Sequence, residues 1–181
     1  MRSGRAAFPL ALIFLLAPPL AALDSRAGIE LGFLSVPVLT PDPYSFAASA
    51  GLWYDLGGIG GLPLSLGAWA GAAGFRPLTS SYGASTMYYG GLETGYDLAL
   101  FQGGDILLTL RPFARAGWYL RGVDILGKVE WGSRPFLSSG LLLDFKSGVL
   151  DLGLSALLSL PLDNRPVVLV GFLQRIGLWL P

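Results

Sequence analysis

The chain has 181 residues, of which 52% are hydrophobic and only 13% are charged, whereas ordinary soluble domains carry about 25% charged residues. Twelve basic residues balance twelve acidic residues, so no positive excess predicts binding to nucleic acid. The 26 glycines and 13 prolines disfavour long helices, and together with the low charge they predict a membrane protein built from strands.

The first 22 residues have the order of a secretory signal peptide. Arg2 and Arg5 precede an apolar run from Phe8 to Ala17, and small residues follow up to Ala22. This order predicts cleavage near Ala22, with an uncleaved anchor as the alternative. We therefore expect two parts, a signal peptide over 1–22 and one β-barrel domain over 23–181.

Eight later segments have the length and composition of strands. A tilted transmembrane strand needs about 9 to 11 residues, and closed bacterial barrels have an even number of strands. The predicted strands cover 27–39, 45–56, 62–75, 86–100, 106–121, 135–146, 149–161 and 166–180. The sequence therefore predicts an all-β fold, a closed eight-stranded antiparallel up-and-down transmembrane barrel.

The segment from Ile106 to Arg121 shows most clearly how the strands face. Its even-numbered residues are apolar, whereas Arg111, Arg115 and Arg121 share the opposite face. In a transmembrane barrel the apolar face meets lipid and the polar face lines the lumen. A soluble β-domain would have the opposite facing, and it remains an alternative.

A helical membrane protein is the other alternative, because the run from Leu56 to Phe75 carries no charge. Seven glycines and leucines at alternate positions in this run favour a pair of strands instead. Two residues disturb the strand pattern elsewhere. Pro112 removes a hydrogen bond in mid-strand, and Gln174 falls on the lipid face, which suggests a bulge or another register.

The connections predict which end of the barrel is external. Short glycine-containing turns at 57–61, 101–105 and 146–148 alternate with longer connections at 76–85 and 122–135, as in outer-membrane barrels. Aromatic residues at both ends of the apolar faces would lie at the membrane interfaces. They are Tyr54, Tyr96 and Phe145 near the short turns, and Tyr88 and Trp118 near the longer connections.

The longest connection is a candidate external loop with an exposed binding surface. Lys128, Glu130 and Trp131 are its candidate contact residues, since charged and apolar side chains are interleaved there. The alternative is that this stretch extends the two flanking strands above the membrane.

Charged residues on the polar faces form a candidate lumen cluster, because interior charges need partners. A hairpin centred near Gly103 would bring Glu93 close to Arg111, with Arg115 within diagonal reach. Closure of the barrel would pair Glu30 with Arg175. Three other charges, Asp97, Asp144 and Asp151, also fall on the lumen faces. The cluster is either a salt-bridged plug or a gate that offers small solutes a polar path.

The sequence lacks the residues on which several common classes of enzyme depend. Without histidine or cysteine, a Ser-His-Asp triad, a Cys-His nucleophile and most zinc sites are excluded. No glycine motif for phosphate is present. We therefore predict no enzyme, no catalytic residue, no metal site and no cofactor.

The mature chain resembles the small eight-stranded outer-membrane barrels, the class of the OmpA transmembrane domain, OmpX/Ail and OmpW. The resemblance rests on the signal peptide, the eight alternating segments, the connections and a last strand VVLVGFLQRIGLWL. It implies a monomer in the bacterial outer membrane, with membrane lipid and the barrel-assembly machinery as partners. Members commonly end on an aromatic residue that this machinery recognises, whereas Leu180 and Pro181 follow Trp179 here.

Three functions follow as hypotheses. The first is a structural or surface-interaction role through the external loops, with an unknown surface ligand. The second is a small pore or channel for small or hydrophobic solutes. The third is a soluble periplasmic barrel with a lipid-binding interior, which requires the apolar faces to turn inward.

Overall fold

The computed structural model describes residues 25–35, 44–58, 63–77, 82–125, 127–161 and 169–179. The predicted signal peptide lies outside these residues and stays a prediction. Within the described residues, no helix is long and apolar enough to cross a membrane.

Nine β-strands make up the described chain. Their bounds are β1 Arg26–Ser35, β2 Tyr44–Gly58, β3 Leu64–Pro77, β4 Tyr82–Tyr96, β5 Leu98–Gly103, β6 Ile106–Ile125, β7 Lys128–Ser147, β8 Leu150–Pro161 and β9 Leu169–Trp179. Only Asp97 separates β4 from β5, and both pair with β6. They therefore form one interrupted strand of the wall, which gives the eight-stranded wall that the sequence predicts.

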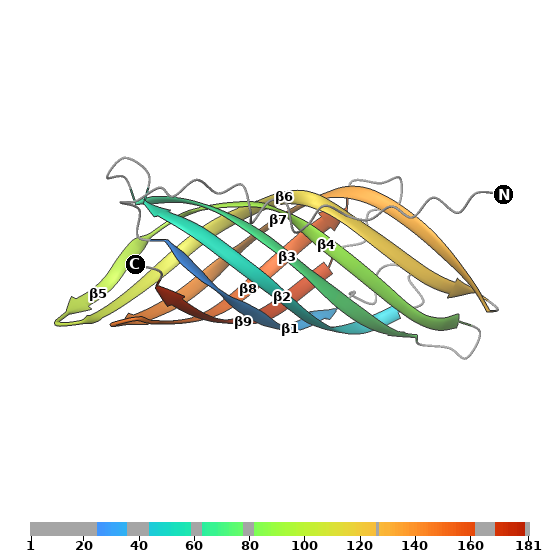
Figure 1. Cartoon of the computed structure of the whole chain (residues 1–181), viewed down its shortest axis with the longest axis horizontal. Coiled ribbons are helices and arrows are strands. Elements are labelled where there is room, and N and C mark those ends of the chain that lie inside the picture. The colour runs from blue at the N-terminus through green and yellow to red at the C-terminus, as the bar shows by residue number, and fades with distance from the viewer. Residues whose placement is uncertain are drawn as a thin grey trace.

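The sheet is a closed antiparallel barrel (Figure 1). Apart from β4 and β5, strands that follow one another in the chain pair with one another. β4 pairs with β6, and β1 pairs with both β2 and β9. The ring is thus complete and has no open side. The predicted all-β, up-and-down barrel is confirmed.

The faces of the strands are inverted relative to a soluble barrel. In β8, Leu152 and Leu154 point outward and are exposed, whereas Asp151 and Ser155 point inward and are buried. The same alternation places the arginines of β6 inside. The apolar faces are therefore on the outside, and the inward-facing lipid-binding hypothesis is wrong.

The last strand, β9, pairs with both of its neighbours without the irregularity that the sequence suggested. Gln174 lies opposite Leu31 and Leu154, with no register shift in either pairing, and its side chain is exposed. The predicted bulge at Gln174 is therefore wrong. Pro112 is likewise exposed on the outer face of β6, within an unbroken pairing to β7.

The two ends of the barrel differ (Figure 1). At one end lie the tight turns after β5 and β7, where Gly104 and Gly148 have φ of 56° and 55°. Arg26 and Trp179, the limits of the paired wall, also lie there. We call this the turn end. The hairpin between β6 and β7 lies at the opposite end, which we call the hairpin end.

The predicted long connections at 76–85 and 122–135 are mostly strand. β3 continues to Pro77, β4 begins at Tyr82, and only residues 126 and 127 separate β6 from β7. β6 and β7 have 20 residues each, so each is about 65 Å long at roughly 3.3 Å per residue. That is roughly twice what a tilted transmembrane strand needs. The hairpin therefore extends beyond β8, which pairs with β7 only from Phe136, while β4 accompanies β6 as far as Ile125.

Candidate functional site: the charged lumen and the protruding hairpin

Four buried side chains from four strands form a closed ionic group across the lumen, which we call the central ion layer. It consists of Glu30 on β1, Glu93 on β4, Arg115 on β6 and Arg175 on β9. Arg115 donates from Nε to Glu93 at 2.6 Å and from Nη2 to Glu30 at 2.6 Å. Arg175 donates from Nε to Glu30 at 2.9 Å and from Nη1 to Glu93 at 2.9 Å. Each arginine bridges both glutamates, so the layer is neutral.

The predicted pairing of Glu93 with Arg111 is wrong. Glu93 lies directly opposite Arg115. The turn between β5 and β6 centres on Gly104 and Asp105, later than expected, and a bulge between Ala99 and Phe101 then shifts the register. Because a shift of one residue reverses the facing of a strand, this bulge places Glu93 opposite Arg115; the register before the bulge would have placed it opposite Ala116.

Arg111 belongs instead to a second group of charges at the turn end, the turn-end ion layer. It donates to Asp97 at 2.5 Å and to Asp55 at 2.5 Å. The other members form their own contacts: Arg26 lies 2.8 Å from Asp151 and 3.3 Å from Asp144, and Lys146 lies 3.3 Å from Asp144. The layer therefore links β1, β2, β6, β7 and β8 with Asp97, the residue between β4 and β5.

Three members of this second layer were missed as lumen charges in the sequence. Arg26 lies just before the predicted start of the first strand, Lys146 falls in a predicted turn, and Asp55 lies near the end of a predicted strand. Asp55 does alternate with Trp53 along β2, and that alternation is the signal that could have placed it inside.

Aromatic rings pack beside the central ion layer. Arg115 lies over the Trp69 ring at 4.5 Å, and Arg175 lies over the Trp53 ring at 5.5 Å. A guanidinium above a ring at such distances is attracted by the electrons of the ring face. The rings therefore stabilise the two cations on sides that no carboxylate covers.

A pair of glycines makes room for these rings. Gly91 and Gly117 lie opposite each other between β4 and β6, with Trp69 and Phe136 on the next strand to either side. A Cβ at Gly91 would lie 2.1 Å from the carbonyl oxygen of Ala116. Because neither glycine has a side chain, the Trp69 and Phe136 rings meet above them, 5.4 Å apart and edge to face.

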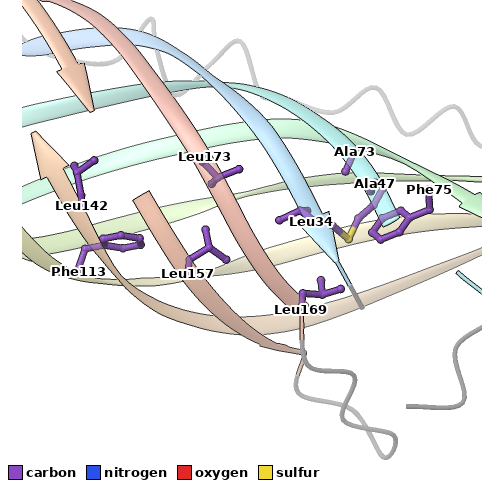
Figure 2. Close-up of a cluster of buried hydrophobic side chains, with 10 residues drawn as sticks. Leu34, Ala47, Ala73, Phe75, Phe113, Leu142, Leu157, Leu169 and Leu173 are labelled. Carbon is purple, nitrogen blue, oxygen red and sulfur yellow. The ribbon is translucent and has the colours of Figure 1, made fainter. Parts of the chain in front are cut away.

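The two ion layers leave little room between them. Phe113 lies between Arg111 and Arg115 on the inner face of β6, and Leu142 is buried on β7. Figure 2 shows these two side chains on one side of the apolar cluster, with Leu34 and Phe75 on the other. The lumen is therefore filled by charge, then by apolar side chains, then by charge again.

The candidate external residues lie in a strand and not in a loop. Lys128, Glu130 and Trp131 belong to β7 and pair with β6, so the alternative of extended strands is correct. Trp131 is 54% exposed and stacks on Tyr88, with ring centroids 6.3 Å apart. A Cβ at Gly122 would meet this indole at 2.9 Å, so the ring lies flat across its opposite glycine.

One edge of the hairpin has no partner strand among the described residues. β7 pairs with β8 only from Phe136 onward, so residues 128–135 pair with β6 alone. Those from Lys128 to Arg134 are all exposed. Within the described residues, the backbone groups on the far side of this segment therefore have no strand partner.

A closed eight-stranded barrel with an apolar outside and an ionic inside is the construction of small transmembrane barrels. No family model matches the sequence, and a comparison of the sequence with curated proteins found no match. Solved structures do match, at probability 1.00.

Three similar structures are bacterial outer-membrane proteins. Neisserial surface protein A is 14% identical, with 86% of this chain and 94% of that chain covered and a TM-score of 0.58. The N-terminal β-barrel domain of Pseudomonas aeruginosa OprF is 12% identical, with 86% and 98% covered and a TM-score of 0.52. Ail, the attachment invasion locus protein of Yersinia pestis, is 14% identical, with 87% and 99% covered and a TM-score of 0.51. The chain therefore has the fold of the small outer-membrane barrels.

Proposed function

We propose that this chain is a monomeric, non-enzymatic outer-membrane barrel whose lumen is closed and whose role is performed at the cell surface by the β6–β7 hairpin. The observation that carries the proposal is the pairing of charges across the lumen combined with a hairpin whose β7 strand extends past β8. A signal peptide over 1–22 and the barrel-assembly machinery would deliver the chain to the outer membrane.

The apolar exterior supports residence in a membrane. Large apolar side chains cover the outer face of the barrel, among them Leu92, Leu154 and Phe172, each more than 60% exposed. Exposing them to water would be costly, at about 25 cal/mol for each Å². Contact with lipid removes that cost.

The hairpin edge supports binding of an extended segment of a surface partner. An added strand gains main-chain hydrogen bonds along an open edge, and residues 128–135 offer such an edge. Val129 and Trp131 lie on its outer face, both more than half exposed. The names of two similar proteins, a surface protein and an attachment invasion locus protein, accord with a role of this kind.

Cysteine labelling of intact cells tests the orientation. The chain has no cysteine, so Val129→Cys at the hairpin introduces a single thiol. We expect a maleimide too large to cross the outer membrane to label Val129→Cys in intact cells. The matched variant Asp105→Cys, in the turn at the other end, should be labelled only after the membrane is opened. Labelling in the reverse order would refute a hairpin on the cell surface.

Conductance tests the closed lumen. The purified protein in planar bilayers should give no stable open state, because solutes would have to separate charges that are paired at 2.5 to 2.9 Å. Reproducible single-channel steps would contradict the plug and favour the pore hypothesis. The variant Arg115→Ala/Arg175→Ala, which removes both cations of the central ion layer, serves as the comparison for leakage.

A further inference from the structure

The strand β5 has an open edge at the turn end of the barrel, which we call the β5 edge. Within the described residues, β5 pairs with β6 alone, and all six of its residues are exposed. On its other side, β3 begins at Leu64, which lies opposite Tyr96 of β4. β5 therefore continues for about 20 Å past the start of β3, at roughly 3.3 Å per residue. Figure 1 shows β5 and the first part of β6 at the far left, beyond the start of β3.

The neighbouring connection is too short to cover this edge. The chain from Gly58 to Pro63 joins β2 to β3, and it can span at most about 18 Å at roughly 3.6 Å per residue. A run beside β5 to Gly103 and back would take about 40 Å, twice the length of β5. The far part of the β5 edge is therefore beyond the reach of this connection.

The backbone and the side chains of β5 make opposite demands on their surroundings. The outward backbone groups cannot lie in hydrocarbon, because open sheet edges do not occur there. Leu100 and Phe101 are each 56% exposed, and contact with water is costly for such apolar side chains. An added strand meets both demands, since it pairs with the backbone and covers the side chains beside it.

A second copy of the chain cannot supply this strand. Two copies in one membrane have the same orientation, so the two-fold axis of such a pair lies along the membrane normal. Transmembrane strands tilt by about 35 to 45°, and two β5 strands related by this axis would cross at roughly 70 to 90°. No ladder forms at that angle, so the strand has to come from another protein.

We propose that the β5 edge binds an extended segment of a periplasmic protein as an added strand. Apolar residues at every second position of that segment cover Leu100 and Phe101. A basic residue of the segment lies near Asp105, an exposed carboxylate in the adjoining turn, whereas Arg26 and Lys146 at this end are buried. The proposal rests on the proposed orientation, with the turn end in the periplasm, and its partner is separate from that of the β6–β7 hairpin.

Hydrogen exchange at Gln102 tests the β5 edge. The two-residue turn closes on the hydrogen-bonded pair of Gly103 with Ile106, and such pairs alternate along an antiparallel ladder. The N–H of Gln102 therefore points away from β6, and in lipid nanodiscs it should exchange fast. The peptide Lys-Val-Thr-Val-Thr-Val-Lys should slow this exchange in a saturable way, by roughly tenfold or more.

A matched peptide separates backbone pairing from side-chain contact. It has the same sequence, with N-methyl groups on two adjacent central residues, one for each of its edges. It keeps every side chain but cannot pair along β5, so it should leave the exchange of Gln102 unchanged. Equal protection by the two peptides would overturn the proposal. Slow exchange at Gln102 before any peptide is added would also overturn it, because the edge would then be covered already.

Variants assign the binding to the β5 edge. Gln102→Pro removes the outward donor without removing a hydrogen bond to β6, and the shifts of the β5 amide resonances should then no longer saturate with peptide. Gln102→Ala should bind as the unchanged chain does, and Asp105→Asn should bind about twofold to fivefold more weakly. Saturation that persists in Gln102→Pro would contradict pairing at this edge. Labelling of Asp105→Cys on intact cells would refute the orientation alone, since the peptide titration measures the edge in either orientation.

Discussion

Replacing Arg175 by methionine is expected to lower the free energy of unfolding by about 3 to 5 kcal/mol, because removing one partner leaves a buried charge without compensation. Arg175 is 3% exposed and contacts both Glu30 and Glu93. Without it, two carboxylates share the single cation Arg115. Urea titration of the protein refolded in lipid vesicles, followed by the mobility difference between folded and unfolded forms on a gel, measures the loss.

The double variant Glu93→Gln/Arg175→Met restores neutrality in the central ion layer. We expect it to lose clearly less stability than the sum of the two single variants, since the two sites are coupled. Lys128→Gln, on the exposed hairpin, is the control and should change stability by less than about 0.5 kcal/mol. Additive losses in the double variant would mean that the ion pairs contribute no coupling energy.

A positive charge on the outer face is expected to have the second large effect. Leu154 is 61% exposed near the middle of β8. In lipid, Leu154→Arg should cost about 2 to 4 kcal/mol, as arginine does near the bilayer midplane on the outside of a barrel. In water the same substitution at an exposed site would cost little. Urea titration in vesicles therefore measures whether this face meets lipid.

Val129→Arg is the matched control for Leu154→Arg. Val129 is 56% exposed and lies on the outer face of the hairpin, where the proposal places it beyond the membrane. We expect a stability change near zero for this variant, because the penalty for arginine declines toward the interfaces. A similar loss in both variants, or in neither, would contradict the depth assigned to β8 and the hairpin.

The facing of the strands could be predicted from the sequence because the side chains of a strand alternate with a period of two. Apolar residues at every second position of β8 determine which side of this strand faces outward. The closed architecture followed from counting such segments. The contacts inside could not be predicted in the same way, since they depend on register, and a bulge between Ala99 and Phe101 decides whether Glu93 meets Arg115.

The residues at which the strands begin and end could not be predicted from the sequence pattern either. Residues 128–134 mix charged and apolar side chains, which is as typical of an exposed loop as of a strand in water. Pairing with β6 makes this stretch a strand, and that pairing is a tertiary effect. The same uncertainty at strand ends removed Arg26 and Lys146 from the predicted set of lumen charges.

The central ion layer takes its four members from β1, β4, β6 and β9, and Glu30 and Arg175 are 145 residues apart in the chain. Contacts between such distant segments form late, because the entropy of closing the chain must be lost first. The layer is therefore complete only when the last strand meets the first. Interactions absent from the folding transition state act mainly on the rate of unfolding. We therefore expect this group of four charges to change the folding rate little and to slow the unfolding of the barrel strongly.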